Sequence, residues 1–241
     1  MLIRRPSSHR QDPDWFMFSS GLMHRLCSDY VAMRMLYRLG RPTTTPTICV
    51  MMIDVVEKSL KLHLAVQSQT KTALSDMRTT HGHNVDSLRR ACAKFHPLFD
   101  DADVRGFTQH LNDRDGKLYQ ELRYGSQETT SGFKTNIGTL LPVVDKVFVQ
   151  SILLLDEGNR RLLVGASPLK SLLTRSPLDQ SQYPEQTIEI LADGNAQFPL
   201  LMKYCQSVAQ EQAALMAKLP KDLMLPLKPE PPSFRVKSAY K

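Results

Sequence analysis

The chain has 241 residues, of which 41% are hydrophobic and 23% charged, as in an ordinary globular protein with a full core. Its formal net charge of +7 is concentrated at the ends. Residues 1–41 carry +4 (seven basic, three acidic), residues 221–241 carry +3 (five basic, two acidic), and nineteen of each sign cancel between them. The neutral body argues against a broad phosphate-binding face, and we interpret the basic ends as solvated termini rather than nucleic-acid arms.

The cysteines and the hydropathy pattern predict a cytoplasmic protein. The four cysteines lie far apart without a CxxC pair, so we expect reduced core residues rather than disulfides or a zinc site: Cys27, Cys49, Cys92 and Cys205. No apolar run approaches the length of a membrane span, and Arg4 and Arg5 precede no signal-type segment. We therefore expect no metal, no cofactor and no membrane contact.

The first forty residues predict a flexible leader and one helix. Residues 1–20 are expected to be the leader, because their first part is polar and contains two prolines. A helix is predicted over residues 21–39, with Gly40 as its cap and this buried stripe: Leu22, Leu26, Tyr30, Met33 and Tyr37. Residues 41–47 are then expected to be a linker.

The amphipathic segment 51–69 is the predicted centre of the fold. One side carries the apolar stripe Met52, Val56, Leu60 and Leu64. The other side carries two acid-before-base pairs four residues apart, Asp54 with Lys58 and Glu57 with Lys61. Each such pair supports a helix by about 0.2–0.5 kcal/mol.

A second, shorter helix is predicted after the polar break at residues 70–84. Asn84 is placed to cap its free amides, and Asp86 lies in the first turn, where negative charge suits the helix dipole. Its buried stripe is predicted to be Val85, Leu88, Cys92 and Phe95. His96 and Pro97 would end it.

The second half of the chain predicts three more helices. They are expected over residues 101–124, 139–155 and 199–219, with Pro142 in the first turn of the second one. Between the last two, residues 160–192 mix short apolar runs with Ser, Pro and Gln, which fits irregular packing or a small strand pair.

The predicted fold class is therefore all-α. Residues 21–155 would form an up-and-down bundle of about five helices, and residues 156–220 an extension with a C-terminal helix. Residues 221–241 are proline-rich and basic, which predicts a disordered tail.

Four short motifs occur along the predicted bundle in a fixed order: CSDYVAMRMLYRLG, MMIDVVEKSLKLHL, HGHNVDSL and ELRYG. In the order, spacing and local sequence of these motifs, residues 21–155 resemble the HEPN superfamily of helical bundles. The resemblance implies a compact, often dimeric domain associated with nucleic-acid metabolism, prokaryotic defence, toxin–antitoxin pairs and partner nucleotidyltransferases. Some members of that superfamily are metal-independent ribonucleases that use an Arg followed a few residues later by a His.

Such RNA cleavage needs a proton acceptor near the ribose hydroxyl and a cation near the phosphate. Arg78 and His83 have the required spacing, but three other pairs also fit: Arg4 with His9, Arg90 with His96, and Arg105 with His110. The spacing alone therefore discriminates little. A purely structural interpretation is that His83 brackets the helix that Asn84 opens.

In the HEPN nucleases the Arg–His pair is expected near this chain's Arg123 and Tyr124, yet no His follows Tyr124. The favoured hypothesis is a non-catalytic binding protein, with Arg123, Tyr124 and Asn84 at the ligand site and RNA or a nucleotide as ligand. It would work as a homodimer, or with a nucleotidyltransferase or antitoxin partner. The alternatives are a metal-independent endoribonuclease using Arg78 and His83, and a structural adaptor.

Overall fold

The computed structural model describes residues 13–68, 77, 79–111, 122, 136–158 and 186–218. These residues form seven α-helices and two short 3-10 helices, and contain no strand. In chain order the elements are α1 (Pro13–Leu39), η1 (Pro42–Thr44), α2 (Thr45–Ser68), α4 (Val85–Ala93), η2 (Pro97–Asp100), α5 (Ala102–Leu111), α8 (Ile137–Gly158), α11 (Gln186–Ala192) and α12 (Phe198–Lys218). The all-α prediction is confirmed for this part of the chain.

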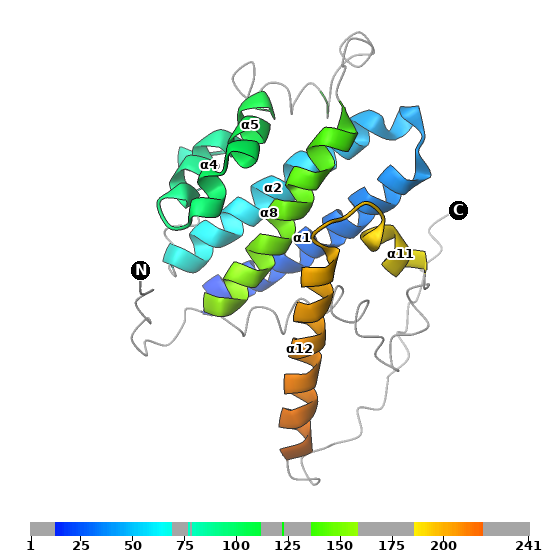
Figure 1. Ribbon diagram of the computed structural model, residues 1–241. Coiled ribbons are helices and arrows are strands. Elements are labelled where there is room, and N and C mark those ends of the chain that lie inside the picture. The colour runs from blue at the N-terminus through cyan, green and yellow to red at the C-terminus, as the bar shows by residue number, and fades with distance from the viewer. Residues whose placement is uncertain are drawn as a thin grey trace, which may run out of the picture.

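Helix α2 is the central element of the bundle. It packs against α1, α8 and α4, and α5 completes the group by contacting α4 and α8 (Figure 1). Met52, Val56 and Leu60 are buried as predicted. Ile53, Val55 and Leu62 are buried as well, because neighbours cover α2 on more than one side.

Helix α1 begins at Pro13, eight residues before the predicted start, so the boundary of the leader at residue 20 is wrong. Proline suits the first position of a helix, where its missing N–H would have no partner. Ser19 and Met23 are both fully buried, which shows that this end of α1 packs on the bundle. At the other end Gly40 has φ +61° and forms the predicted cap.

The predicted linker 41–47 is shorter than expected, because α2 already begins at Thr45. Pro46 occupies the second residue of the helix, where an N–H is not required. The linker therefore reduces to the single turn of η1 and the residues beside it.

The α4 segment confirms the predicted cap and three of the four predicted core residues. Val85, Leu88 and Cys92 are buried, but Phe95 is 55% exposed. The prediction for Phe95 is wrong because α4 ends at Ala93, which breaks the helical phase. Phe99 of η2, only 1% exposed, fills the core instead.

The apolar pattern of helix α8 predicts six inward residues, of which Leu140 is only partly buried and five are buried: Leu141, Val144, Val147, Phe148 and Ile152. It begins at Ile137, so Pro142 lies inside the helix rather than in its first turn. Ile137–Leu155 has the length and hydropathy of a membrane span, with a mean hydropathy of 1.6, which corrects the expectation that no such run exists. This helix packs against α2 and α5 in the bundle core.

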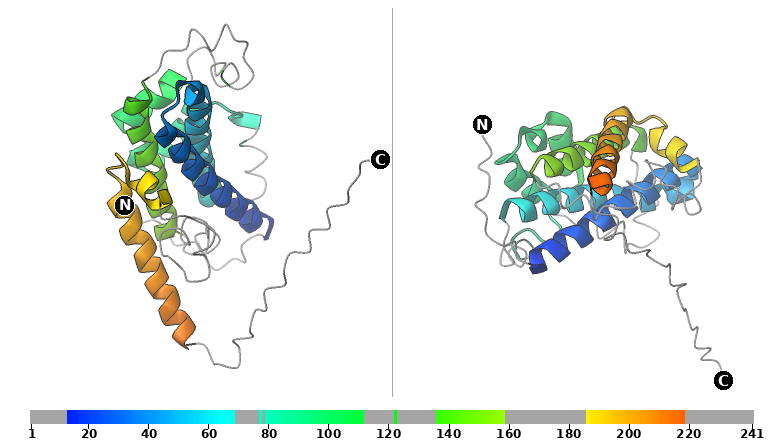
Figure 2. Two further views of the ribbon diagram at one scale, coloured as in Figure 1. Left: turned by 90° about the vertical axis from the view of Figure 1, so that its right-hand side faces the viewer. Right: turned by 90° about the horizontal axis from the view of Figure 1, so that it is seen from below.

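The C-terminal part adds α11 and the predicted helix α12. Residues 186–192, where the sequence fitted irregular packing or a strand pair, are helical and form α11. Helix α12 packs its first turns on the bundle through the buried Leu201 and Cys205, and then runs away from the other described helices (Figures 1 and 2). Residues 159–185 and the predicted tail 221–241 lie outside the described residues.

Candidate functional site

The candidate site is the α2–α4 corner, where the turn before α4 meets the polar side of α2. It consists of Glu57, Lys61, His81, His83, Asn84 and Ser87. The turn is closed by a 2.8 Å hydrogen bond from the Asn84 amide to the His81 carbonyl. Gly82 has φ +51°, a conformation that other residues adopt at a cost.

Asn84 fixes this turn to the start of α4. Its side-chain oxygen accepts a 2.8 Å hydrogen bond from the Ser87 amide, as an N-cap residue does. The prediction that Asn84 caps the helix is confirmed. The oxygen of Asn84 is therefore engaged by the protein itself, and His83, the residue before it, is held in a defined position.

His83 lies against the carboxylate of Glu57. Its Nδ1 is 3.1 Å from Oε1 and 3.2 Å from Oε2. Lys61, one turn along α2, donates to the same Oε1 at 2.5 Å, and the predicted Glu57–Lys61 pair is thereby confirmed. Two cationic or hydrogen-bonding groups thus share one carboxylate.

The burial of the three side chains is very different. The Glu57 side chain is 7% exposed, that of Lys61 21% and that of His83 59%. Taking a carboxylate out of water costs several kcal/mol unless partners compensate it. Lys61 and His83 supply that compensation, and His83 at the same time presents more than half of its surface to the outside.

His81 forms the second half of the corner. Its Nδ1 is 2.8 Å from the Ser87 hydroxyl. Partial burial lowers the pKa of His81 below its usual value, and the nearby charge of Lys61 lowers it further. Both effects favour the neutral imidazole, so His81 contributes hydrogen bonds to the corner rather than charge at neutral pH.

Of the predicted site residues, His83 and Asn84 are described. Arg78, Arg123 and Tyr124 lie outside the described residues, so their convergence with His83 stays a prediction. Leu122, next to Arg123, is buried at 7% exposure. In the part of the chain that the structure describes, no group of three His, Cys, Asp or Glu side chains could hold a metal ion.

Sequence reasoning missed that Glu57 belongs to the site. We predicted Glu57 and Lys61 as one of two acid-before-base pairs on the polar side of the helix. One turn away on the helix surface, Glu57 has the apolar Ile53 and Leu60 on one side and the polar Asp54 and Lys61 on the other. It therefore stands at the border of the apolar stripe, where a carboxylate is partly buried and gains from a partner elsewhere in the fold.

A second polar group joins α4, η2 and α5. Arg89, only 4% exposed, donates to Asp86 at 2.9 Å, to the Phe99 carbonyl at 3.1 Å and to Asp100 at 3.2 Å. Thr108 donates to Asp86 at 3.2 Å. These side chains satisfy one another and hold three elements together, which is a structural role.

Comparison with known proteins adds no relative. No family model, no curated protein and no solved structure matches the chain.

Proposed function

We propose that the chain is a HEPN-like helical-bundle protein that acts by binding RNA or a nucleotide, and that the α2–α4 corner is its working surface. The observation that carries the proposal is the contact between Glu57 and His83. Glu57 belongs to the EKSLKL motif of α2, and His83 to the GHN motif before α4. Two of the motifs that resemble the HEPN superfamily, 26 residues apart in the chain, thus share a hydrogen bond.

The chemistry of the corner fits a phosphate-bearing ligand. Lys61 is a cationic donor beside the largely exposed ring of His83, and the carboxylate of Glu57 contacts both side chains. The rest of the chain between the basic ends is neutral, which limits non-specific attraction to phosphate. Binding is therefore expected to be local and of modest affinity.

The proposal includes the assembly that the resemblance implies. We expect a cytoplasmic protein that works as a homodimer, or together with a nucleotidyltransferase or antitoxin partner. Light scattering on the purified protein tests the dimer: a mass of twice the chain supports it, and the mass of one chain contradicts it.

The test of binding uses one histidine variant and one matched control. Fluorescence anisotropy with a labelled single-stranded oligoribonucleotide should show saturable binding, weakened about tenfold by His83→Ala, which corresponds to about 1.4 kcal/mol. His24→Ala, which removes an exposed histidine from the face of α1, should leave the affinity unchanged. Equal affinities for wild type and His83→Ala would overturn the assignment of the corner.

One observation favours the ribonuclease alternative as a second candidate. The His83 ring is 59% exposed at a helix entry, and a general base must be reachable by the ribose hydroxyl. This candidate predicts RNA cleavage in the presence of EDTA, lost in both His83→Ala and Arg78→Ala. Intact RNA after incubation with an excess of wild-type protein would exclude it.

A further inference from the structure

The orientation of His83 depends on Glu57, a residue that the sequence did not assign to the ligand site. His83 is on a turn and is largely exposed, and such a side chain ordinarily samples several rotamers. Here the two oxygens of Glu57 lie at nearly equal distances from Nδ1. Glu57 is itself held on α2, the central helix of the bundle. The elements packed around α2 leave Glu57 only 5% exposed.

The direction of the hydrogen bond follows from the chemistry of the carboxylate. An ionised carboxylate has acceptors only, so the hydrogen must be carried by Nδ1 of His83. In the neutral ring the lone pair is then on Nε2, whereas a histidine without such a partner carries its hydrogen mostly on Nε2. A carboxylate at one ring nitrogen is the usual means by which proteins choose a tautomer.

We propose that Glu57 is the positioning residue of the α2–α4 corner: it fixes His83 in the Nδ1–H tautomer and directs Nε2 as the ring nitrogen that serves the ligand. Lys61 donates to Oε1 of the same carboxylate at 2.5 Å, and so limits the rotation of the Glu57 side chain. The part of this inference that concerns the ligand rests on the proposed function. The part that concerns the tautomer does not.

The direct test is the tautomer of His83, read from the ¹⁵N shifts of its ring nitrogens in two-bond ¹H–¹⁵N spectra above the pH at which the ring titrates. Wild type should show the Nδ1–H form. Glu57→Ala should show mostly the Nε2–H form, and Glu57→Gln should keep Nδ1–H because its amide oxygen also accepts. An Nε2–H ring in the wild type would overturn the proposal.

RNA-binding measurements separate a positioning role of Glu57 from a merely structural one. With the same labelled oligoribonucleotide, Glu57→Ala should lose about as much affinity as His83→Ala, the double variant should lose no more, and Glu57→Gln should recover part of it. Additive losses would contradict action through His83. If wild type binds no RNA but shows the Nδ1–H tautomer, the proposed function fails and the positioning of His83 by Glu57 stands.

Two controls show whether a variant has lost a specific contact or has simply failed to fold. Asp54→Ala removes another carboxylate of α2, one that pairs with Lys58, and should change neither the tautomer nor the binding. Glu57→Ala should retain the helical circular-dichroism spectrum of the wild type. A spectrum of an unfolded chain would shift the test to Glu57→Gln, whose loss of the Nδ1–H tautomer would then count against the proposal.

Discussion

Arg34 of α1 and Asp145 of α8 form an ion pair in which each side chain is only 1% exposed, with Nη1 and Oδ2 3.3 Å apart. Arg34 also donates to the backbone carbonyls of Leu191 and Asp193. Leu191 lies in the last turn of α11, whose terminal carbonyls lack partners within the helix, and Asp193 follows that helix. One guanidinium therefore joins α1 and α8 to the α11–α12 turn.

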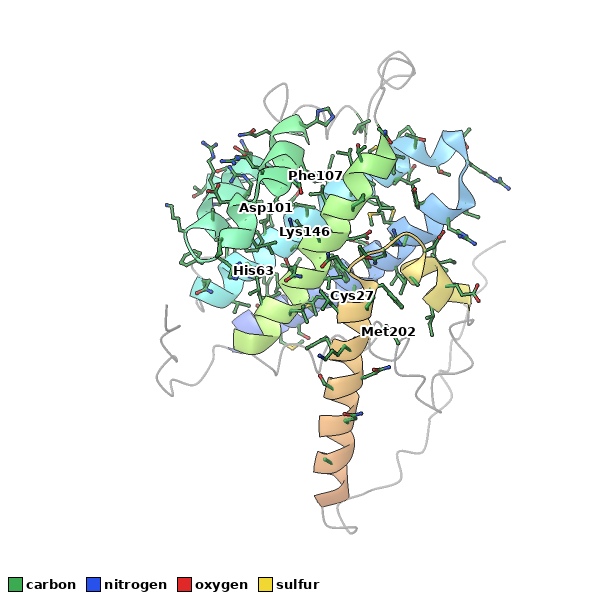
Figure 3. The ribbon with its side chains drawn as sticks, in the orientation of Figure 1. Cys27, His63, Asp101, Phe107, Lys146 and Met202 are labelled. Atoms are coloured by element: carbon green, nitrogen blue, oxygen red, sulfur yellow. The ribbon has the colours of Figure 1, made fainter. Side chains whose placement is uncertain are left out.

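Two further side chains complete this buried group. The Tyr30 hydroxyl donates to Asp145 at 2.8 Å, and the Asn195 amide donates to the Tyr30 hydroxyl at 2.8 Å. The Tyr30 ring stacks on Phe148, with centroids 3.7 Å apart. Apolar packing and one buried ion pair thus attach α11 and the first turns of α12 to the bundle. Cys27 and Met202 lie in this region (Figure 3).

The first prediction concerns Arg34. Arg34→Met leaves Asp145 buried without its cation, and should lower the free energy of unfolding by about 3–5 kcal/mol. The double variant Arg34→Met/Asp145→Leu should recover most of this loss. Arg38→Met is the matched control, because the Arg38–Asp193 pair is exposed at 57% and 48%, and such pairs contribute about 1 kcal/mol or less. Urea unfolding measures all three, and equal losses for Arg34 and Arg38 would contradict this account.

The second prediction concerns His63, whose ring packs edge-on against Phe99 at 4.7 Å. Burial, and then the neighbouring His96, lower the pKa of His63 from 6.5 to about 3, against a hydrogen bond to the Ser151 backbone that raises it. The unfolded chain binds a proton on His63 more tightly than the folded chain does. The contribution of the neutral His63 ring to the free energy of unfolding is therefore complete above pH 6.5 and is lost as the pH falls toward 3.

The measurement compares urea unfolding of wild type and His63→Leu at pH 7 and pH 4.5. Between these values wild type should lose about 2–3 kcal/mol relative to the variant. Wild type and variant must be compared with each other at each pH, because Asp145 changes the free energy of unfolding of both proteins in the opposite direction. Burial raises its pKa to about 6, although Arg34 and Tyr30 lower it, so its contribution grows as the pH falls from 6. A constant difference between the proteins would refute the prediction for His63.

The third prediction separates Phe95 from Phe99. Phe99→Ala empties a core position that is 1% exposed, and should cost about 3–5 kcal/mol. Phe95→Ala removes a ring that is 55% exposed and should cost less than about 1 kcal/mol. The two variants are compared by chemical denaturation. A larger loss for Phe95 would restore the original prediction that α4 continues its buried stripe to this residue.

The fourth prediction concerns the cap at Asn84. Asn84→Ala removes the acceptor for the Ser87 amide and should cost about 1 kcal/mol, whereas Asn84→Asp keeps an acceptor and should cost little. Thermal unfolding measures both. The same variants test the predicted role in binding. If Asn84→Ala loses RNA affinity and Asn84→Asp keeps it, the affinity depends on the helix cap. Asn84 then acts through the turn that carries His83.

The sequence predicted those parts of the fold in which one face of a helix is apolar. Met52, Val56 and Leu60 established α2, and Leu141, Val144 and Phe148 established α8, because burial repeats with the period of the helix. Helix ends were less predictable: α1 continues back to Pro13 through residues with no clear stripe. Phe95 was misplaced for the same reason, since a periodic pattern does not report where the helix stops.

The polar interior was hardly predictable. Arg34 lies toward the end of the predicted helix 21–39, and its partner Asp145 lies 111 residues away. The contact between Glu57 and His83 is likewise set by how α2 and the turn before α4 pack together. Such pairs are tertiary relationships, and spacing along one helix does not contain them.

The central claim is that a ligand binds at the α2–α4 corner, and backbone amide shifts test it most directly. ¹H–¹⁵N spectra recorded during titration with a short single-stranded oligoribonucleotide should show saturable changes at residues 57–61 and 81–87, and these changes should disappear in His83→Ala. Changes confined to other helices, or spectra that do not respond to the RNA at all, would contradict the account.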